Sequence, residues 1–276
     1  MILLDGQASG DALLSDRGLN YGDGLFETIV LRDGSLLGWE KHMARLGHGC
    51  AVLGLTLPSP TQLFDEAHTV AGSRRRGIVK IVLTRSGEGR GYRPSRAACA
   101  RRIVAWHDWP MELDGHDLAP VSTWMCQHRL GSNPQLAGIK HINRLEQVLA
   151  SAEWPAPHYF EGLMQDFDGL LIEGTRSNIF LLREGQLLTP ALTRCGVSGI
   201  VRAAVIDAAP RLGLSAQICS IATASLTATD EMLICNSVFG LRVVSQLDNG
   251  DKSLRLNNSG LLAALDEQLR ADNVIP

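Results

Sequence analysis

The sequence predicts a mixed α/β fold of the α+β kind, divided into two domains, and three observations predict it. Strand-like and helix-like apolar patterns alternate along the first hundred residues. A composition break at 109–120, "WPMELDGHDLAP", carries a proline near each end. The 276 residues suffice for one large domain or two medium ones. We expect a smaller N-terminal α/β domain over 1–110, a linker over 111–120 and a larger C-terminal α/β domain over 121–276.

The composition excludes several classes of protein. Hydrophobic residues make up 45% and charged residues 20% of the chain, with a net charge of -3, so neither nucleic acid nor an anionic membrane is expected as a partner. No apolar run approaches the roughly 18 residues that span a bilayer. The N-terminus lacks a basic start, so we expect a cytoplasmic protein without a signal peptide. Six cysteines without a C-x-x-C pair and eight dispersed histidines predict no disulfide framework and no metal site.

The first part of the chain opens with a predicted short strand and turn. "GLFETIVLRDGSLLGWEKHMARL" then predicts a strand over 25–31, a tight turn at Asp33-Gly34, a second strand near 35–38 and a helix from about 39. "TQLFDEAHTVAGS" predicts another helix. "GIVKIVLTRS" (77–86) and "RRIVAWHDW" (101–109) predict two antiparallel strands. The Gly-rich "GEGRGYRPSRAA" between them is typical of a hairpin loop.

The second part contains the segment "LAGIKHINRLEQVLASAEW" (136–154). Residues 136–139 suggest the tail of an extended segment, and the apolar residues after Lys140 recur at helical spacing, namely Ile142, Leu145, Val148, Leu149 and Ala152. Lys140 therefore lies just before the N-terminus of a predicted helix. A lysine there either points to solvent or points into a pocket and acts as a nucleophile.

The rest of the second part predicts strands and two more helices. Residues 160–190 predict three short strands, with turns at Asp168-Gly169 and Glu184-Gly185. "VSGIVRAAVIDAAPRLG" predicts a helix with Ser198 as N-cap and Gly199 in the first turn. A buried strand over 232–235, a break at Asn236-Ser237, another strand and a closing amphipathic helix, "SGLLAALDEQLRA", follow.

Four further features could cooperate with Lys140. Glu173 ends an apolar strand, where a carboxylate is costly to bury without a partner. The helix start at Gly199 and the "CNS" break at 235–237 offer free amides to an anion, and Arg45 lies on a helix whose other face is apolar. Each also has an ordinary interpretation as an exposed turn residue, an empty helix start, a simple turn or a solvated arginine.

This set of groups matches the requirements of pyridoxal phosphate. A lysine bonds to the cofactor aldehyde, and a carboxylate keeps the ring nitrogen protonated so that the ring accepts electrons. An arginine and backbone amides bind the phosphate.

Several motifs, in order along the chain, resemble those of a known family. They are "SDRGLNYGDGLFETI", "SGEGRGYRP", "LGSNPQLAGIKHINRLEQVL", "EGTRSNIF", "GVSGIVR" and "TDEMLICNSV". From about residue 3 to about 245 the chain resembles the two-domain fold-type IV pyridoxal-phosphate enzymes, the D-amino-acid aminotransferase-like group. The group includes branched-chain and D-amino-acid aminotransferases and 4-amino-4-deoxychorismate lyases. The "GRGY" and "GIKHINRLEQV" segments resemble those of the lyases in particular.

The resemblance implies a role for each matching residue. Lys140 corresponds to the cofactor lysine, Glu173 to the partner of the ring nitrogen and Arg45 to the phosphate arginine. The positions that cradle the phosphate correspond to Gly199, Ile200, Asn236 and Ser237. Arg144 is included among the cofactor-binding positions, and it replaces a tyrosine of branched-chain aminotransferases, which favours the lyase. The substrate side corresponds to Thr28, Tyr92 and Arg93, whereas Glu27 is less informative.

The implied reaction converts 4-amino-4-deoxychorismate to 4-aminobenzoate and pyruvate in folate biosynthesis. Lys140 would serve as the general base, and the departing enolpyruvate would gain a proton from Lys140 or from a nearby hydroxyl such as Thr28. The resemblance also implies a homodimer. Two alternatives remain open: a transaminase of the same fold acting on D-amino or branched-chain amino acids, and a non-catalytic binding protein.

Overall fold

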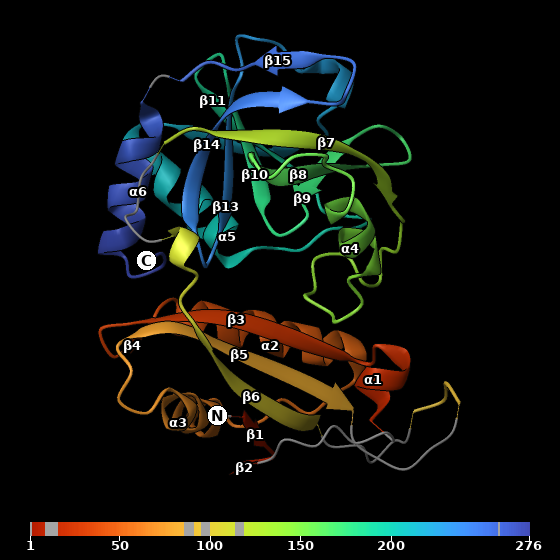
Figure 1. Cartoon of the computed structure of the whole chain (residues 1–276), viewed down its shortest axis with the longest axis vertical. Coiled ribbons are helices and arrows are strands. Elements are labelled where there is room, and N and C mark those ends of the chain that lie inside the picture. Colours follow the sequence, from red (N-terminus) through yellow and green to blue (C-terminus); the bar gives the residue numbers. More distant parts are fainter. Residues whose placement is uncertain (1, 9–15, 86–90, 95–99, 114–118, 259) are drawn as a thin grey trace. The chain divides into compact units, whose positions relative to one another are not determined.

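The computed structural model describes residues 2–8, 16–85, 91–94, 100–113, 119–258 and 260–276 (Figure 1). The chain forms two compact units, each described here by itself. The first unit comprises Met1–Asp114 and Ile139–Asn143, and the second comprises Gly115–Gly138 and Arg144–Pro276. The predicted linker includes residues 114–118, which lie outside the described residues.

The first unit contains an antiparallel six-stranded sheet in the order β2-β1-β6-β5-β3-β4. Its strands are β1 (Ile2–Leu4), β2 (Gln7–Ala8), β3 (Gly24–Arg32), β4 (Ser35–Leu36), β5 (Arg76–Arg85) and β6 (Ala100–Asp108). The strands predicted over 25–31, 77–86 and 101–109 are confirmed. Asp33 and Gly34 both have positive φ angles, of 50° and 85°, as the predicted two-residue hairpin turn between β3 and β4 requires.

Two long helices cover one face of this sheet (Figure 1). The helices of the first unit are α1 (Arg17–Tyr21), α2 (Trp39–Leu53) and α3 (Pro60–Ala71), and a short 3₁₀ turn follows at Met111–Leu113. Alternate residues of β3 point toward α2 because side chains of a strand alternate between its faces. This inward row consists of Leu25, Glu27, Ile29 and Leu31, all of them buried. Phe26 and Thr28 therefore lie on the opposite face of the sheet.

The second unit contains a mixed nine-stranded sheet in the order β12-β11-β10-β13-β14-β7-β8-β9, with β15 paired to β14. The strands are β7 (Val121–Leu130), β8 (Tyr159–Asp166), β9 (Leu171–Gly174), β10 (Asn178–Arg183), β11 (Gln186–Pro190), β12 (Ser215–Cys219), β13 (Glu231–Asn236), β14 (Gly240–Asp248) and β15 (Ser253–Arg255). The prediction of three strands over 160–190 is wrong, since there are four. A tight turn, closed by the Gly174 N–H donating to the Ser177 carbonyl at 2.7 Å, separates β9 from β10.

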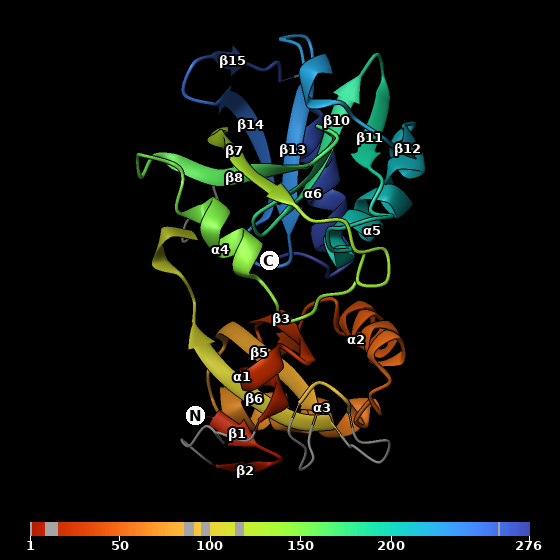
Figure 2. The ribbon, with the colours of Figure 1, turned by 90° about the vertical axis from the view of Figure 1, so that its right-hand side faces the viewer.

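The described residues of the second unit form three α-helices, α4 (Leu145–Ser151), α5 (Ile200–Ala208) and α6 (Leu261–Ala271), with 3₁₀ turns at Ala209–Leu212 and Thr223–Ser225. Helices α5 and α6 pack beside each other on β13 and β14 (Figure 2). Their buried faces share one core with the sheet, including Phe180, Val205, Leu233 and Leu265. Ser198 was predicted as the N-cap of α5, but Gly199 occupies that position and no side chain caps the helix.

The segment around Lys140 differs most from its prediction. Residues 134–137 form a turn, and the helix begins only at Leu145. Residues 139–143 instead run beside the start of β3: the Phe26 N–H donates to the Lys140 carbonyl at 3.0 Å, and the Ile142 N–H donates to that of Gly24 at 3.1 Å. These bonds group Lys140 with the first unit, which corrects its assignment to the C-terminal domain.

The predicted apolar face of this helix is also not a core face within the chain. Leu145, Val148 and Leu149 are 70%, 60% and 51% exposed, whereas Gln147 and Ala150 are buried. Within the described residues, no helix is both long enough and apolar enough to cross a bilayer.

Candidate active site

Lys140 lies against the face of β3 that does not contact α2. Its Nζ lies 4.3 Å from the centroid of the Phe26 ring, and the residue is half-buried. Phe26 is the residue whose N–H binds the Lys140 carbonyl. The backbone and the side chain of Lys140 thus both contact Phe26 of β3. These contacts favour a lysine whose amine has a fixed position over an ordinary surface lysine.

Thr28 and Lys80 share this face of the sheet with Phe26. Thr28 stands directly opposite Lys80 in the β3–β5 register, so their side chains project from the same face. The Lys80 Nζ lies 5.5 Å from the Phe26 centroid. The predicted residues Lys140 and Thr28 are therefore grouped around Phe26 together with a second amine, Lys80. The prediction missed Lys80. Because side chains alternate between the two faces of a strand, the predicted strand 77–86 places this charged side chain on one face of the sheet, the face on which Thr28 lies.

Arg45 lies on the opposite face, where it forms a buried ion pair. Its Nε donates to Glu27 Oε1 at 2.8 Å, and its Nη2 donates to Oε2 at 2.5 Å. The side chain of Arg45 is only 11% exposed, so the interpretation as a solvated arginine is wrong. His42, one helical turn before Arg45, places Nδ1 2.6 Å from Glu27 Oε2. Sequence reasoning gave Glu27 little weight and missed His42, although the i, i+3 spacing on α2 places His42 and Arg45 on one helix face.

The charges of this cluster follow from burial and contact. Burial opposes ionisation of Glu27, but the charges of Arg45 and His42 and their hydrogen bonds lower the pKa of Glu27 to about 2. Burial lowers the pKa of His42; Glu27 opposes this shift, and Arg45 and Lys140 add to it. At neutral pH the cluster therefore holds a Glu27 carboxylate, an Arg45 cation and a neutral His42 whose Nδ1–H donates to Glu27.

The low pKa of Glu27 predicts a loss of stability in acid. Since the unfolded chain binds the proton near 4.5 and the folded protein near 2, the contribution of Glu27 is complete above pH 4.5 and is lost as the pH falls toward 2. Urea unfolding of the wild type and Glu27→Gln across this range is expected to show a steeper fall for the wild type. Parallel pH profiles would contradict the assigned ionisation.

Glu173 is the buried carboxylate of the second unit. It is 4% exposed, and its Oε2 accepts the Val197 N–H at 2.7 Å, while its Oε1 accepts Gln147 Nε2 at 3.4 Å. Arg144 lies within electrostatic reach: burial lowers the pKa of Arg144, and the charge of Glu173 opposes that shift. Glu173 is therefore a fixed carboxylate and not an exposed turn residue, and Arg144 is its cationic neighbour.

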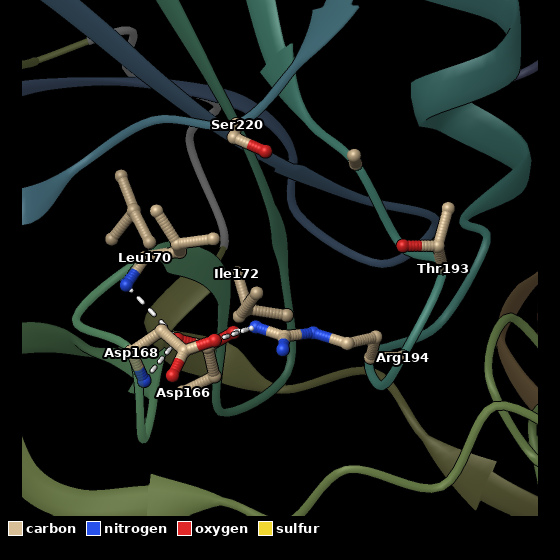
Figure 3. Close-up of a pocket in the computed structure, with 9 residues that line it drawn as sticks. Asp166, Asp168, Leu170, Ile172, Thr193, Arg194 and Ser220 are labelled. Atoms are coloured by element: carbon tan, nitrogen blue, oxygen red, sulfur yellow. Dashed lines mark hydrogen bonds and ion pairs between the residues drawn. The ribbon is translucent and has the colours of Figure 1, made fainter.

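The loop that carries Val197 is anchored on its other side by Arg194. In Figure 3 the Arg194 guanidinium points at the carboxylates of Asp166 and Asp168, with Nη2–oxygen distances of 2.5 and 2.6 Å. These groups line a pocket of about 290 Å³ beside the β8–β9 hairpin. The ion pair ties the loop to the hairpin from which Glu173 projects, so it helps to hold Val197 in place.

A second buried carboxylate, Glu161, supports the turn that follows Glu173. It is fully buried and accepts hydrogen bonds from Thr175 Oγ1 at 2.6 Å, Ser177 Oγ at 2.9 Å and the Gly162 N–H at 3.0 Å. Burial raises the pKa of Glu161, and these bonds oppose the shift. The prediction missed Glu161, because only the folded turn brings its partners together.

The predicted phosphate-binding positions lie at the start of α5 and after β13. The first N–H groups of a helix lack partners within it and favour an anion. A Cβ at Gly199 would lie 1.9 Å from Asn178 Oδ1, so a larger residue at this helix start would have to displace the Asn178 side chain. The Asn236 side chain has a structural role: its Oδ1 accepts the N–H groups of Val238 and Phe239 at 2.9 and 2.8 Å. It thereby shapes the turn that carries Ser237.

The predicted substrate-side loop is described only from residue 91 onward, since 86–90 lie outside the described residues. Tyr92 is 86% exposed, and Arg93 is exposed too. Arg17 donates to the carbonyls of Gly91 and Tyr92 at 2.9 and 3.0 Å, so α1 fixes this part of the loop. The structure does not join Tyr92 or Arg93 to the group around Phe26 by any contact among the described residues.

Comparison with known proteins identifies the family. A family described as amino-transferase class IV matches residues 24–247. The chain belongs to this family. Its members depend on pyridoxal phosphate, so the cofactor predicted from the residues is confirmed at the level of the family.

Individual relatives of this class IV chain include a lyase and transaminases. It is 31% identical over 245 residues to an aminodeoxychorismate lyase of Vibrio harveyi, covering 89% of this chain and 90% of the relative. Its structure is similar to the crystal structure of 4-amino-4-deoxychorismate lyase from Pseudomonas aeruginosa, with a TM-score of 0.91, a sequence identity of 37% and 100% of each chain covered. A D-alanine aminotransferase of Bacillus licheniformis is 26% identical over 238 residues, 85% of this chain and 82% of the relative. The predicted fold-type IV architecture is confirmed by these matches.

The residues of this class IV protein fit its cofactor. The first unit supplies an amine over an aromatic ring and an arginine on a buried carboxylate. The second unit supplies a carboxylate that accepts a backbone N–H and a helix start at Gly199, where an added Cβ would meet the Asn178 side chain. Taken by itself, each unit therefore holds groups whose chemistry suits a part of pyridoxal phosphate: an amine and an arginine in the first unit, and a carboxylate and free helix amides in the second. The described residues contain no group of three or more His, Cys, Asp or Glu side chains that could hold a metal ion.

Proposed function

We propose that this protein is a lyase that converts 4-amino-4-deoxychorismate to 4-aminobenzoate and pyruvate, a step of folate biosynthesis. The observation that carries the proposal is the similarity to two proteins named as this lyase, at 31% and 37% identity over nearly the whole chain. Homologous transaminases align at lower identity, such as 26% for the D-alanine aminotransferase.

The residues are assigned roles that follow from their surroundings. Lys140 is proposed as the residue that would hold the cofactor aldehyde, and its free amine would serve as the general base for the proton on the substrate ring carbon that bears nitrogen. Glu173, held by the Val197 N–H, is proposed to keep the ring nitrogen protonated. Bound pyridoxal phosphate supplies an electron sink for the carbanion. Loss of the enolpyruvyl oxygen then makes the substrate ring aromatic.

The anionic groups of cofactor and substrate need cationic partners. Arg45 and the amides at Gly199, Ile200 and Ser237 are proposed to bind the phosphate. Lys80 is proposed to bind one of the two substrate carboxylates, because its amine stands beside Thr28 and Phe26 on the face that carries Lys140. The Thr28 hydroxyl, on the same face, is proposed to give a proton to the departing enolpyruvate.

The test is an assay of pyruvate release from aminodeoxychorismate without any keto-acid acceptor. We expect stoichiometric release of pyruvate and 4-aminobenzoate, because a lyase needs no acceptor for the amino group. Amino transfer from D-amino or branched-chain amino acids to 2-oxoglutarate, without pyruvate release from aminodeoxychorismate, would identify the transaminase instead. A protein without either activity and without visible cofactor absorption would favour the binding protein.

The transaminase remains the second candidate because one specific observation favours it. Lys140 and Glu173 would serve either reaction, and this chain aligns with a D-alanine aminotransferase over 85% of its length. The homodimer and the cytoplasmic location remain predictions.

A further inference from the structure

Glu27 occupies a position that an apolar residue would be expected to fill. It is the only ionisable member of the inward row Leu25, Glu27, Ile29 and Leu31 on β3, and it is fully buried. Moving a carboxylate and a guanidinium out of water costs several kcal/mol per ion, and replacing such a pair by apolar residues is often neutral or stabilising. Stability alone therefore does not explain the Glu27–Arg45 pair.

The geometry of the pair fixes the orientation of Arg45. Two parallel contacts, Nε to Oε1 at 2.8 Å and Nη2 to Oε2 at 2.5 Å, join one edge of the guanidinium to the carboxylate. A bidentate contact of this kind sets both the position and the plane of the guanidinium.

His42 in turn fixes the carboxylate. Its ring is fully buried, and its Nδ1 lies 2.6 Å from the same Glu27 oxygen that accepts Arg45 Nη2. Among the described residues, His42 Nε2 has no hydrogen-bond partner, so the Glu27 contact is the polar interaction that orients the ring. A supporting partner that orients a binding side chain typically changes ligand affinity without touching the ligand.

We propose that Glu27 and His42 are positioning residues that hold the Arg45 guanidinium in the orientation that binds the cofactor phosphate. This inference rests on the proposed assignment of Arg45 to the phosphate. The cofactor bond and the ring-nitrogen contact are assigned to other residues, Lys140 and Glu173, so the loss of Glu27 or His42 is expected to act mainly on the phosphate contact.

The experiment compares the affinities of the full-length protein, stripped of cofactor, for pyridoxal phosphate and for pyridoxal, which lacks the phosphate. Arg45→Ala is the reference variant: its loss of affinity for pyridoxal phosphate measures the whole proposed phosphate contact, because the substitution removes that contact itself. Glu27→Gln and His42→Gln are expected to weaken binding of pyridoxal phosphate by about tenfold, the effect of losing one hydrogen bond to a charged group. Binding of pyridoxal is expected to change less than threefold in both variants, because its contacts do not include Arg45.

Glu66→Gln is the matched control. Glu66 is a buried carboxylate of the same unit, on α3, and it pairs with the Nη2 of Arg102 at 3.0 Å. This variant loses a buried ion pair but is expected to keep the wild-type preference for pyridoxal phosphate. If Glu27→Gln does not fold, Glu27→Asp, which keeps the charge but shortens its reach, replaces it with the same expected loss.

Two results would overturn the inference. The first is a preference for pyridoxal phosphate that survives unchanged in the Glu27 and His42 variants while Arg45→Ala removes it. The second is equal weakening of pyridoxal phosphate and pyridoxal, which would indicate a general structural role. Failure of the wild type to bind either compound would instead reject the proposed function.

Discussion

Lys140→Ala is expected to abolish both the visible absorption of the lysine-bound cofactor and the lyase activity. The Lys140 Nζ lies over Phe26 at 4.3 Å, and it would act first as the nucleophile and then as the base. Since general-base catalysis alone contributes about 100-fold to 10,000-fold, turnover should fall by more than about a thousandfold. An absorption spectrum and the pyruvate assay measure the two effects.

Lys80→Ala is the control for this prediction. Lys80 is the other amine near Phe26, at 5.5 Å, and its loss should leave the cofactor absorption intact while raising KM for the dianionic substrate. Borohydride reduction of the wild type should attach the cofactor to the peptide that contains Lys140. Attachment to a Lys80 peptide, or a coloured and active Lys140→Ala protein, would reject the assignment.

Glu173→Gln is expected to retain the cofactor but to slow turnover by about a hundredfold, in the range of a lost acid–base contribution. A neutral amide can still accept the Val197 N–H that now binds Oε2 at 2.7 Å, so the loop should keep its position. The amide cannot hold the ring nitrogen protonated, so the electron sink weakens. Cofactor titration and steady-state kinetics separate binding from turnover.

Asp230→Asn supplies a control of equal burial. Asp230 is 1% exposed and binds Arg183 through two hydrogen bonds of 2.7 and 2.8 Å. It precedes β13, at the end of the β10–β13 ladder opposite to the Asn178–Cys235 pair. We expect this variant to lose stability but to keep the wild-type kcat. Equal loss of kcat in both variants, or wild-type turnover in Glu173→Gln, would contradict the electron-sink role.

The sequence predicted correctly those helices, strands and turns whose formation depends on short-range sequence patterns. Strands β3, β5 and β6 have strong apolar alternation or β-branched runs, and Asp33-Gly34 is a turn dipeptide, so their prediction needed no distant partner. The segment 139–143 escaped prediction because its structure depends on β3, more than a hundred residues earlier. A helical apolar spacing there indicated a helix face, but the helix starts later and leaves Leu145 exposed.

The candidate site divides in the same way. The amino-acid types and their motifs identified Lys140, Glu173 and Arg45 as chemically suited to pyridoxal phosphate, because nucleophile, carboxylate and phosphate arginine are properties of single side chains. Glu161 carried no such signal and His42 only its i, i+3 spacing from Arg45, since a supporting residue is recognised chiefly by what it contacts.

The sequence by itself determined the family and the cofactor, and it predicted the residues whose chemistry suits that cofactor, since side-chain types and the order of motifs are properties of the chain itself. Only the tertiary structure decided the partner of each charged side chain: Arg45 pairs with Glu27, and Glu173 accepts a hydrogen bond from the Val197 N–H. The physical reason is that burial makes an unpaired charge prohibitively costly, and the group available to satisfy it depends on which strands, helices and loops meet at that point.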